Sequence, residues 1–310
     1  LFMYNVQASI FNSLGDSKRP LYLLIFSSLL NIALDMVFVI CFHQGVRGVA
    51  VATLIAQGVS AVLSFFLLMR KLKGYEEEEK YGCYDFGMMR SMVKIAVPST
   101  LQQSIVNMGI LLVQSVVNSF GSAALAGYSA GSRIESLSIV PMLAMGNAMS
   151  TFTAQNIGAG KLDRVKEGYK MCYVTVLTVG AGLCIMYQLL GGAFVSMFLE
   201  SGGSTAYSVG VSYVKFLSFF YAFIGLKATT DGLLRGAGDV AAFTAANLVN
   251  LSIRVIVTNV FAPVYGIQVA WMAVPMGWAA NYIISFGWYL TGKWKRVKVI
   301  SADQGEKRKN

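Results

Sequence analysis

Charged residues are scarce in this sequence, because Asp, Glu, Lys and Arg together make up only 13% of its 310 residues. Hydrophobic residues make up 55%, and stretches of about twenty or more apolar residues recur along the whole chain. Stretches of this length are typical of helices that cross a bilayer, and this composition excludes an ordinary soluble domain. The composition therefore predicts an all-α polytopic membrane protein.

Residues that carry enzyme chemistry are also few, since the sequence has one histidine and four cysteines. His43 has no nearby nucleophile or acid, and no Gly-rich phosphate loop occurs, so we expect neither an enzyme nor direct use of ATP. The cysteines show no paired spacing, which argues against a structural metal site and a disulfide framework. No cofactor is expected. The net charge of +10 comes from short basic loops rather than a basic helix, which argues against nucleic-acid binding.

Eight complete spans are expected to follow one partial apolar segment at the N-terminus. They are predicted at residues 20–42, 46–70, 91–119, 125–157, 165–195, 207–234, 240–262 and 267–291. Lys and Arg concentrate in alternate connections and in the tail, whereas Arg47 is alone in the other set of connections. By the positive-inside rule, linker 71–90 and tail 293–310 are predicted to be cytoplasmic. The expected location is the cell (plasma) membrane.

The chain is expected to divide at its longest polar stretch, the linker 71–90. The other predicted parts are the end of an N-terminal lobe (1–70), a C-terminal lobe (91–292) and a tail (293–310). An internal repeat supports two related lobes, because Gly15-Asp16 and Gly238-Asp239 each precede a span, a glycine turn and a second span. Both copies start on the same side of the membrane, so the repeat is parallel, as in many transporters. By symmetry, we expect further helices of the first lobe to be missing before residue 1.

One carboxylate is expected at membrane depth in the first complete span. Asp35 lies inside the apolar stretch 20–42, and Asn31 is one helical turn earlier on the same face. Thr53 lies equally deep in the next span, so two antiparallel helices bring the three side chains to one level. Such oxygen ligands suit a proton or a small cation such as Na⁺. The alternative is a hydrogen bond that only holds the helices together.

Several motifs resemble those of the multidrug and toxin extrusion (MATE) transporters. They are Ile95-Ala96-Val97-Pro98, residues 121–130 with Arg133-Ile134, residues 154–160, and residues 234–239 with the later Arg254. The resemblance covers the whole chain and implies twelve helices in two six-helix lobes, of which this N-terminally truncated chain would hold the end of helix 4 and helices 5 to 12. It implies a DinF-like member, because Asn31, Asp35 and Thr53 match the coupling-ion site of that branch, which an Asp on helix 1 completes. The acids of the NorM branch fall at Val106 and Ile224, so a second-lobe cation site of that kind is not expected.

Three amide side chains in the span 91–119 are candidates for a substrate cavity. Gln103 and Asn107 are four residues apart, and Gln114 lies about three turns from Gln103, so all three share one face of a helix. Amides on one face either line a cavity and bond to varied substrates, or they bond to neighbouring helices. Both interpretations remain open from the sequence.

Charged residues in the span 207–234 are further candidates for the cavity. Lys227 and Asp231 are one turn apart and are expected to neutralise each other, either as a structural pair or beside a substrate. Lys215 has no local partner, so it reaches either the membrane surface or a central cavity, where it would favour anionic or zwitterionic substrates. Arg133 with Glu135, near the outer end of its span, forms either a gate or a structural pair, and we favour the structural pair. We interpret Arg254 as structural.

Together these observations predict an antiporter, coupled to H⁺ or Na⁺, that exports drugs or other organic compounds. An ion bound at Asp35 would neutralise the carboxylate and so shift the balance between two conformations. We expect small organic substrates and the lipid bilayer as partners, and a protein that works as a monomer. Two alternatives stay open. One is a flippase for lipid-linked precursors, which would need a more cationic cavity than Lys215 provides, and the other is a membrane scaffold that transports nothing.

Overall fold

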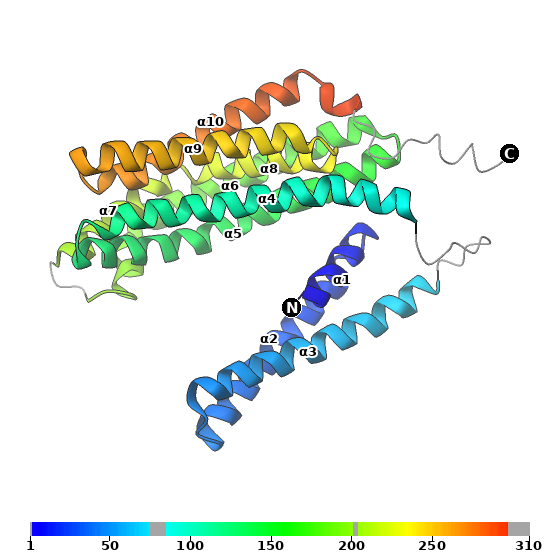
Figure 1. Ribbon diagram of the computed structural model, residues 1–310, viewed down its shortest axis with the longest axis horizontal. Helices are drawn as coiled ribbons and strands as arrows, with labels where there is room; N and C mark the ends of the chain where they lie inside the picture. The colour runs from blue at the N-terminus through cyan, green and yellow to red at the C-terminus, as the bar shows by residue number, and fades with distance from the viewer. Residues whose placement is uncertain (1, 75–84, 201–203, 297–310) are drawn as a thin grey trace. The chain divides into compact units, whose positions relative to one another are not determined.

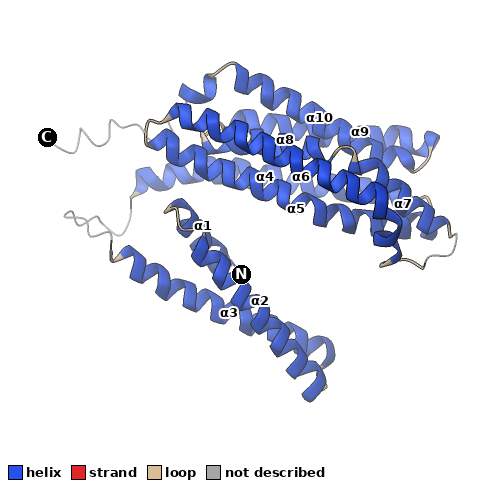
Figure 2. Ribbon diagram, turned by 180° about the vertical axis from the view of Figure 1, so that it is seen from behind, coloured by secondary structure: helices blue, strands red, loops and turns tan. Residues whose placement is uncertain are grey.

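The computed structural model describes residues 2–74, 85–200 and 204–296. Every regular element in those ranges is helical, and the chain divides into two compact units, Leu1–Tyr84 and Asp85–Asn310 (Figure 1, Figure 2). Seven of the described helices are long and apolar enough to cross a membrane, and a bent pair of helices raises this number to as many as eight. The predicted all-α polytopic membrane fold is therefore confirmed.

The first unit is built around a helical hairpin. Its elements are α1 (Phe2–Ser13), α2 (Lys18–Met36), the π-helix η1 (Val37–Cys41) and α3 (Gly45–Leu72). A three-residue turn joins η1 to α3, so α2 and α3 pack side by side in opposite directions (Figure 1). The bounds of the hairpin agree to within a few residues with the predicted spans 20–42 and 46–70. Helix α2 starts two residues before Pro20.

The second unit contains the remaining helices. They are α4 (Phe86–Asn118), α5 (Ser122–Gly158), α6 (Leu162–Ser196), α7 (Thr205–Ser218), α8 (Tyr221–Gly236), α9 (Val240–Tyr265), α10 (Gln268–Leu290) and the 3-10 helix η2 (Lys293–Arg296). Helices α3 and α4 extend into the two ends of the predicted linker 71–90. Residues 75–84 of that linker and residues 297–310 of the predicted tail lie outside the described residues.

The predicted span 207–234 consists of two helices instead of one. The chain breaks after Ser218 and restarts at Tyr221, and the two helices α7 and α8 are bent by 53°. The break leaves the Lys215 carbonyl without its usual helical donor, and side chains replace it. Gln188 of α6 donates to this carbonyl at 2.8 Å, and the Ser218 hydroxyl donates to it at 2.7 Å. A neighbouring helix thus compensates the break, as membrane proteins require.

The internal repeat has the same local structure in both units. In each copy, a glycine with positive φ precedes an aspartate that accepts a bond from the backbone N–H three residues later. Each aspartate is also tied to the end of the second helix of its pair. Lys71 Nζ lies 2.8 Å from Asp16 Oδ2, and Trp288 Nε1 donates to Asp239 Oδ2 at 2.6 Å. The repeated Gly-Asp thus starts one helix and fixes it to the next.

Glycines bring α5 and α8 into backbone contact in the second unit. A Cβ atom added at Gly232 would lie 2.1 Å from the Gly146 carbonyl oxygen, and one added at Gly236 would lie 2.2 Å from the Ser150 carbonyl oxygen. Any larger residue would therefore push the two helices apart, as at small-residue contacts in other membrane proteins. This contact holds the polar face of α8 in place beside the cavity described below.

Candidate functional site

The first unit brings two of the three predicted ion ligands into contact. Asn31 Nδ2 donates to Thr53 Oγ1 at 3.3 Å, so these residues of α2 and α3 lie at the same level. Asp35 is half-buried one turn further along α2, and its Oδ1 atom is buried with no hydrogen-bond partner among the described residues. A carboxylate oxygen in this state is costly unless a proton, an ion or water compensates it.

A polar cavity of about 190 Å³ lies beside the Asn31–Thr53 contact. Its polar lining comes from Tyr4, Asn5, Ser27, Ser28, Asn31, Thr53, Gln57 and Ser60. Asp35 is not among the lining residues. The first unit therefore offers an amide and a hydroxyl next to a polar cavity, with the carboxylate one helical turn away from Asn31.

A π-helical turn, which the sequence does not indicate, begins two residues after Asp35. The backbone N–H of Phe42 donates to the Val37 carbonyl at 3.2 Å, a bond that spans five residues instead of four. Single π-helical turns within α-helices are frequently found at functional sites. The segment Val37–Cys41 is wholly apolar, so no residue type in it signals the change in helix geometry.

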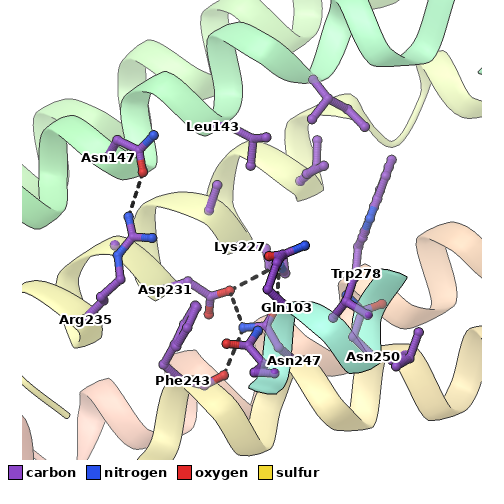
Figure 3. A pocket seen from close by; sticks show the side chains of 18 of the residues that line it. Gln103, Leu143, Asn147, Lys227, Asp231, Arg235, Phe243, Asn247, Asn250 and Trp278 are labelled. Atoms are coloured by element: carbon purple, nitrogen blue, oxygen red, sulfur yellow. Dashed lines mark hydrogen bonds and ion pairs between the residues drawn. The ribbon is translucent and has the colours of Figure 1, made fainter. Parts of the chain in front are cut away.

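The second unit holds a larger cavity, with a volume of about 340 Å³ (Figure 3). This volume lies within the range of about 300–1,000 Å³ that is typical of sites for small organic molecules. The charged lining residues are Glu135 of α5, Lys227, Asp231 and Arg235 of α8, and Arg254 of α9. Two aromatic rings, of Phe243 and Trp278, also line the cavity. Its amide side chains are those of Gln102, Gln103, Asn147, Asn247 and Asn250.

Asp231 is the centre of a hydrogen-bond network at this cavity. Its Oδ2 atom lies 3.2 Å from Lys227 Nζ and accepts a bond from Asn247 Nδ2 at 3.2 Å (Figure 3). Its Oδ1 atom accepts a bond from the Ser285 hydroxyl at 2.7 Å. Lys227 Nζ also donates to Asn247 Oδ1 at 3.0 Å. The ion pair predicted between Lys227 and Asp231 is therefore present, and Asn247 of α9 and Ser285 of α10 form hydrogen bonds to it.

The other charged residues of the cavity contact neutral groups. Arg235 Nη2 donates to Asn147 Oδ1 at 2.7 Å (Figure 3). Glu135 is buried and accepts a hydrogen bond from the Tyr213 hydroxyl. Among the residues that the structure describes, Arg235, Arg254 and Glu135 form no ion pair within 4.0 Å.

The remaining predicted cavity residues lie outside the lining, except for Gln103. Gln103 lines the cavity and donates to Asn107 at 3.2 Å, but Asn107 is not a lining residue. Gln114 is also outside and bonds to the next amide of its own helix. The aliphatic stem of Lys215 faces Gly191 of α6, where an added Cβ would lie 3.4 Å from its Cγ atom. Lys215 therefore does not supply the positive charge of this cavity.

Two cavity residues were interpreted as structural from the sequence. Glu135 and Arg254 lie on α5 and α9, and only the packed structure shows that they line one cavity. Val106 and Ile224, the two apolar positions singled out in the sequence, line the same cavity. Two acids are thus present in this cavity: Glu135 lies on another helix than the resemblance implied, and Asp231 lies on α8, the helix of Ile224.

Comparisons with known proteins support this architecture. The family profile described as MatE matches residues 98–260, and that of the lipid II flippase MurJ matches residues 1–118. Two relatives come from Bacillus subtilis. The probable multidrug resistance protein YpnP is 27% identical over 97% of this chain and 67% of its own length. The probable multidrug resistance protein YoeA is 26% identical over 96% of this chain and 66% of its own length. An outward-facing multidrug resistance MATE family transporter is 20% identical, with a TM-score of 0.83 over 95% of this chain and 67% of its own. The chain thus spans about two thirds of the length of these relatives.

Proposed function

Because the chain belongs to the MATE family, we propose that it acts in a cation-coupled antiporter that exports organic compounds across the cell membrane. The observation that carries this proposal is the state of Asp35. Its carboxylate lies in a candidate membrane span, and one of its oxygens is buried without a partner among the described residues. Binding of H⁺ or Na⁺ removes this uncompensated charge, so the ion favours the conformation in which the site is closed.

The neighbouring side chains support an ion that arrives and leaves. Asn31 and Thr53 offer neutral oxygen atoms near Asp35, and neutral ligands release an ion more readily than a second carboxylate would. In antiport, the ion stabilises one conformation and the organic substrate stabilises the other, so each drives the other across the membrane. The cavity of the second unit, with Gln103, Lys227 and Asp231 in its wall, is the proposed substrate site.

The test is dye accumulation in everted vesicles that contain the full-length protein, under an imposed H⁺ or Na⁺ gradient. We expect Asp35→Asn to lower gradient-driven accumulation by about tenfold or more, because the variant cannot change charge. Asp163→Asn is the matched control, since this surface carboxylate is 91% exposed and is expected to leave accumulation unchanged. Equal accumulation by Asp35→Asn and the unmodified protein under both gradients would contradict the coupling role.

Thr53→Val identifies the coupling ion in the same assay. A sodium ion needs several oxygen ligands, whereas a proton needs only the carboxylate. Loss of Na⁺-driven accumulation in Thr53→Val indicates sodium coupling. Undiminished H⁺-driven accumulation in the same variant indicates proton coupling.

A flippase for lipid-linked precursors is the second candidate function. Two observations favour it: residues 1–118 match the MurJ profile, and the larger cavity has three cationic lining residues, Lys227, Arg235 and Arg254. The test is transfer of a fluorescent polyprenyl-diphosphate sugar between the leaflets of liposomes that contain the full-length protein. Transfer that requires the three cations, together with no gradient-driven dye transport, would favour this function over antiport.

A further inference from the structure

The cavity of the second unit has positive side chains that protein contacts do not neutralise. Three cations and two acids line it: Lys227, Arg235 and Arg254, against Glu135 and Asp231. The formal charge is therefore positive even with both acids ionised. Which of these charges can reach a ligand depends on the contacts that each already makes.

Asp231 is not available to a cationic ligand. Its two oxygens accept bonds from Asn247 and Ser285 and pair with Lys227, and its side chain is only 6% exposed. A carboxylate with these partners has little capacity for another donor. A cationic substrate would have to displace Lys227 from it, at the cost of leaving that ammonium group unpaired.

Arg235 is available to an anion. Its guanidinium has five N–H groups, of which one donates to Asn147 at 2.7 Å and one to Ser150 at 3.4 Å. Both partners are neutral, and the guanidinium carbon lies 5.8 Å from the centre of the Phe243 ring. Its other three N–H groups can donate to a carboxylate, sulfonate or phosphate.

Arg254 packs closely against Gly277 of α10. A Cβ atom added at Gly277 would lie 3.0 Å from Arg254 Cγ and 2.2 Å from Asn250 Oδ1, so a larger residue would displace both side chains. The nearby acid Glu135 is bonded by Tyr213 and forms no ion pair with Arg254 among the described residues. Arg254 is thus a second guanidinium in the cavity wall without a carboxylate in contact.

We propose that this cavity binds amphiphilic organic anions, with Arg235 and Arg254 as partners of the anionic group and Trp278 and Phe243 as walls for a flat apolar body. The proposal deepens the function proposed above, because it rests on the second unit being the substrate site. The anion can belong to a soluble aromatic compound or to a lipid-linked phosphate, since both present the same chemistry to the two guanidinium groups.

The test is direct binding of two matched dyes to the purified full-length protein in detergent, measured by fluorescence anisotropy. Fluorescein and rhodamine 123 share one tricyclic ring system, but the first is an anion and the second a cation. We expect fluorescein to bind at least about tenfold more tightly than rhodamine 123. Arg235→Gln and Arg254→Gln should each weaken fluorescein binding about tenfold, which corresponds to the loss of one charge-assisted contact. Rhodamine 123 binding should not weaken in either variant.

Three further variants separate charge from folding. Arg254→Lys keeps the cation and should retain fluorescein binding to within about threefold, whereas Arg254→Glu should reverse the preference toward rhodamine 123. Arg133→Gln removes an exposed guanidinium of α5 outside the cavity and should change neither dye. Displacement of fluorescein by farnesyl diphosphate would indicate a lipid-linked anion, and displacement only by aromatic sulfonates a soluble one.

Two results would overturn the proposal. One is equal or tighter binding of rhodamine 123, and the other is fluorescein binding that is absent or insensitive to both arginine substitutions. Its failure is distinguishable from that of the antiport function. Gradient-driven export of a cationic dye that Asp35→Asn abolishes, together with either of these two binding results, would keep the antiporter and reject the anion cavity.

Discussion

The buried ion pair between Lys227 and Asp231 predicts a strong energetic coupling between these positions. We consider Lys227→Met, which removes the positive charge, Asp231→Asn, which removes the negative charge, and the double variant, which removes both. The two side chains are 14% and 6% exposed, so the small value of about 0–1 kcal/mol for surface ion pairs does not apply. Each single variant instead leaves a buried charge without its counterion.

The expected magnitudes follow from the bonds that survive each change. Removal of one partner of a buried pair costs about 3–5 kcal/mol of unfolding free energy. Lys227→Met falls at the lower end, about 3 kcal/mol, because Asn247 and Ser285 still donate to Asp231. Asp231→Asn leaves the Lys227 ammonium with only neutral acceptors, and we expect a cost of about 4 kcal/mol. The double variant buries no charge and should cost less than the sum by about 2 kcal/mol, within the range for groups in contact.

The assay is equilibrium unfolding in mixed micelles of dodecylmaltoside and SDS, followed by tryptophan fluorescence. The four proteins form a double-mutant cycle from which the coupling energy is obtained directly. Lys166→Met and Asp163→Asn provide a parallel cycle on an exposed pair, for which a much smaller coupling energy is expected because water screens the two charges. A coupling energy below about 0.5 kcal/mol at Lys227 and Asp231 would refute the reasoning, since it would mean that water reaches and screens the pair.

Two further predictions concern the stability that a close helix contact and the Asp16–Lys71 pair provide. Gly232→Ala should destabilise the protein by about 2 kcal/mol or more, because the added Cβ would lie 2.1 Å from the Gly146 carbonyl oxygen. Gly182→Ala is the control: an added Cβ there meets nothing within 4 Å, so the substitution should stabilise the protein by up to about 1 kcal/mol. Equal effects of the two substitutions in the same unfolding assay would contradict the close helix contact. The hydrogen bond from Lys71 holds the pKa of Asp16 below its ordinary value of 3.8. The stability that this lowered pKa adds is therefore fully present above a pH of about 4 and is lost as the pH falls through the lowered value. Unfolding free energies of the unmodified protein and Asp16→Asn should thus converge below that range, and a difference that does not change with pH would contradict the assignment.

Most of the helices could be predicted from the sequence because membrane spans need long apolar stretches. The break between α7 and α8 could not, since Phe219 and Phe220 at the break are as apolar as the helices on either side. Its stability depends on Gln188, a residue of α6 that is distant in sequence and satisfies the freed carbonyl. Local sequence patterns do not show such a compensation between helices.

The two candidate sites were predictable to different degrees. Asn31 and Thr53 were placed together because a short turn fixes the relative depth of two adjacent helices, and their contact at 3.3 Å agrees with that reasoning. The larger cavity draws on α4, α5, α8, α9 and α10, so its membership depends on how five helices pack. Arg254 belongs to it and Lys215 does not, although both are single cations within apolar stretches.

Asp35 and Asp231 differ in the contacts of their carboxylate oxygens. Asp231 has a cation and two neutral donors on its oxygens, so protonation would break an established ion pair. Asp35 has one buried oxygen with no partner among the described residues, so a proton or an ion would relieve an existing cost without breaking a bond to that atom. This difference supports the proposal that Asp35 couples transport to the ion, and that Asp231 belongs to the framework of the proposed substrate cavity.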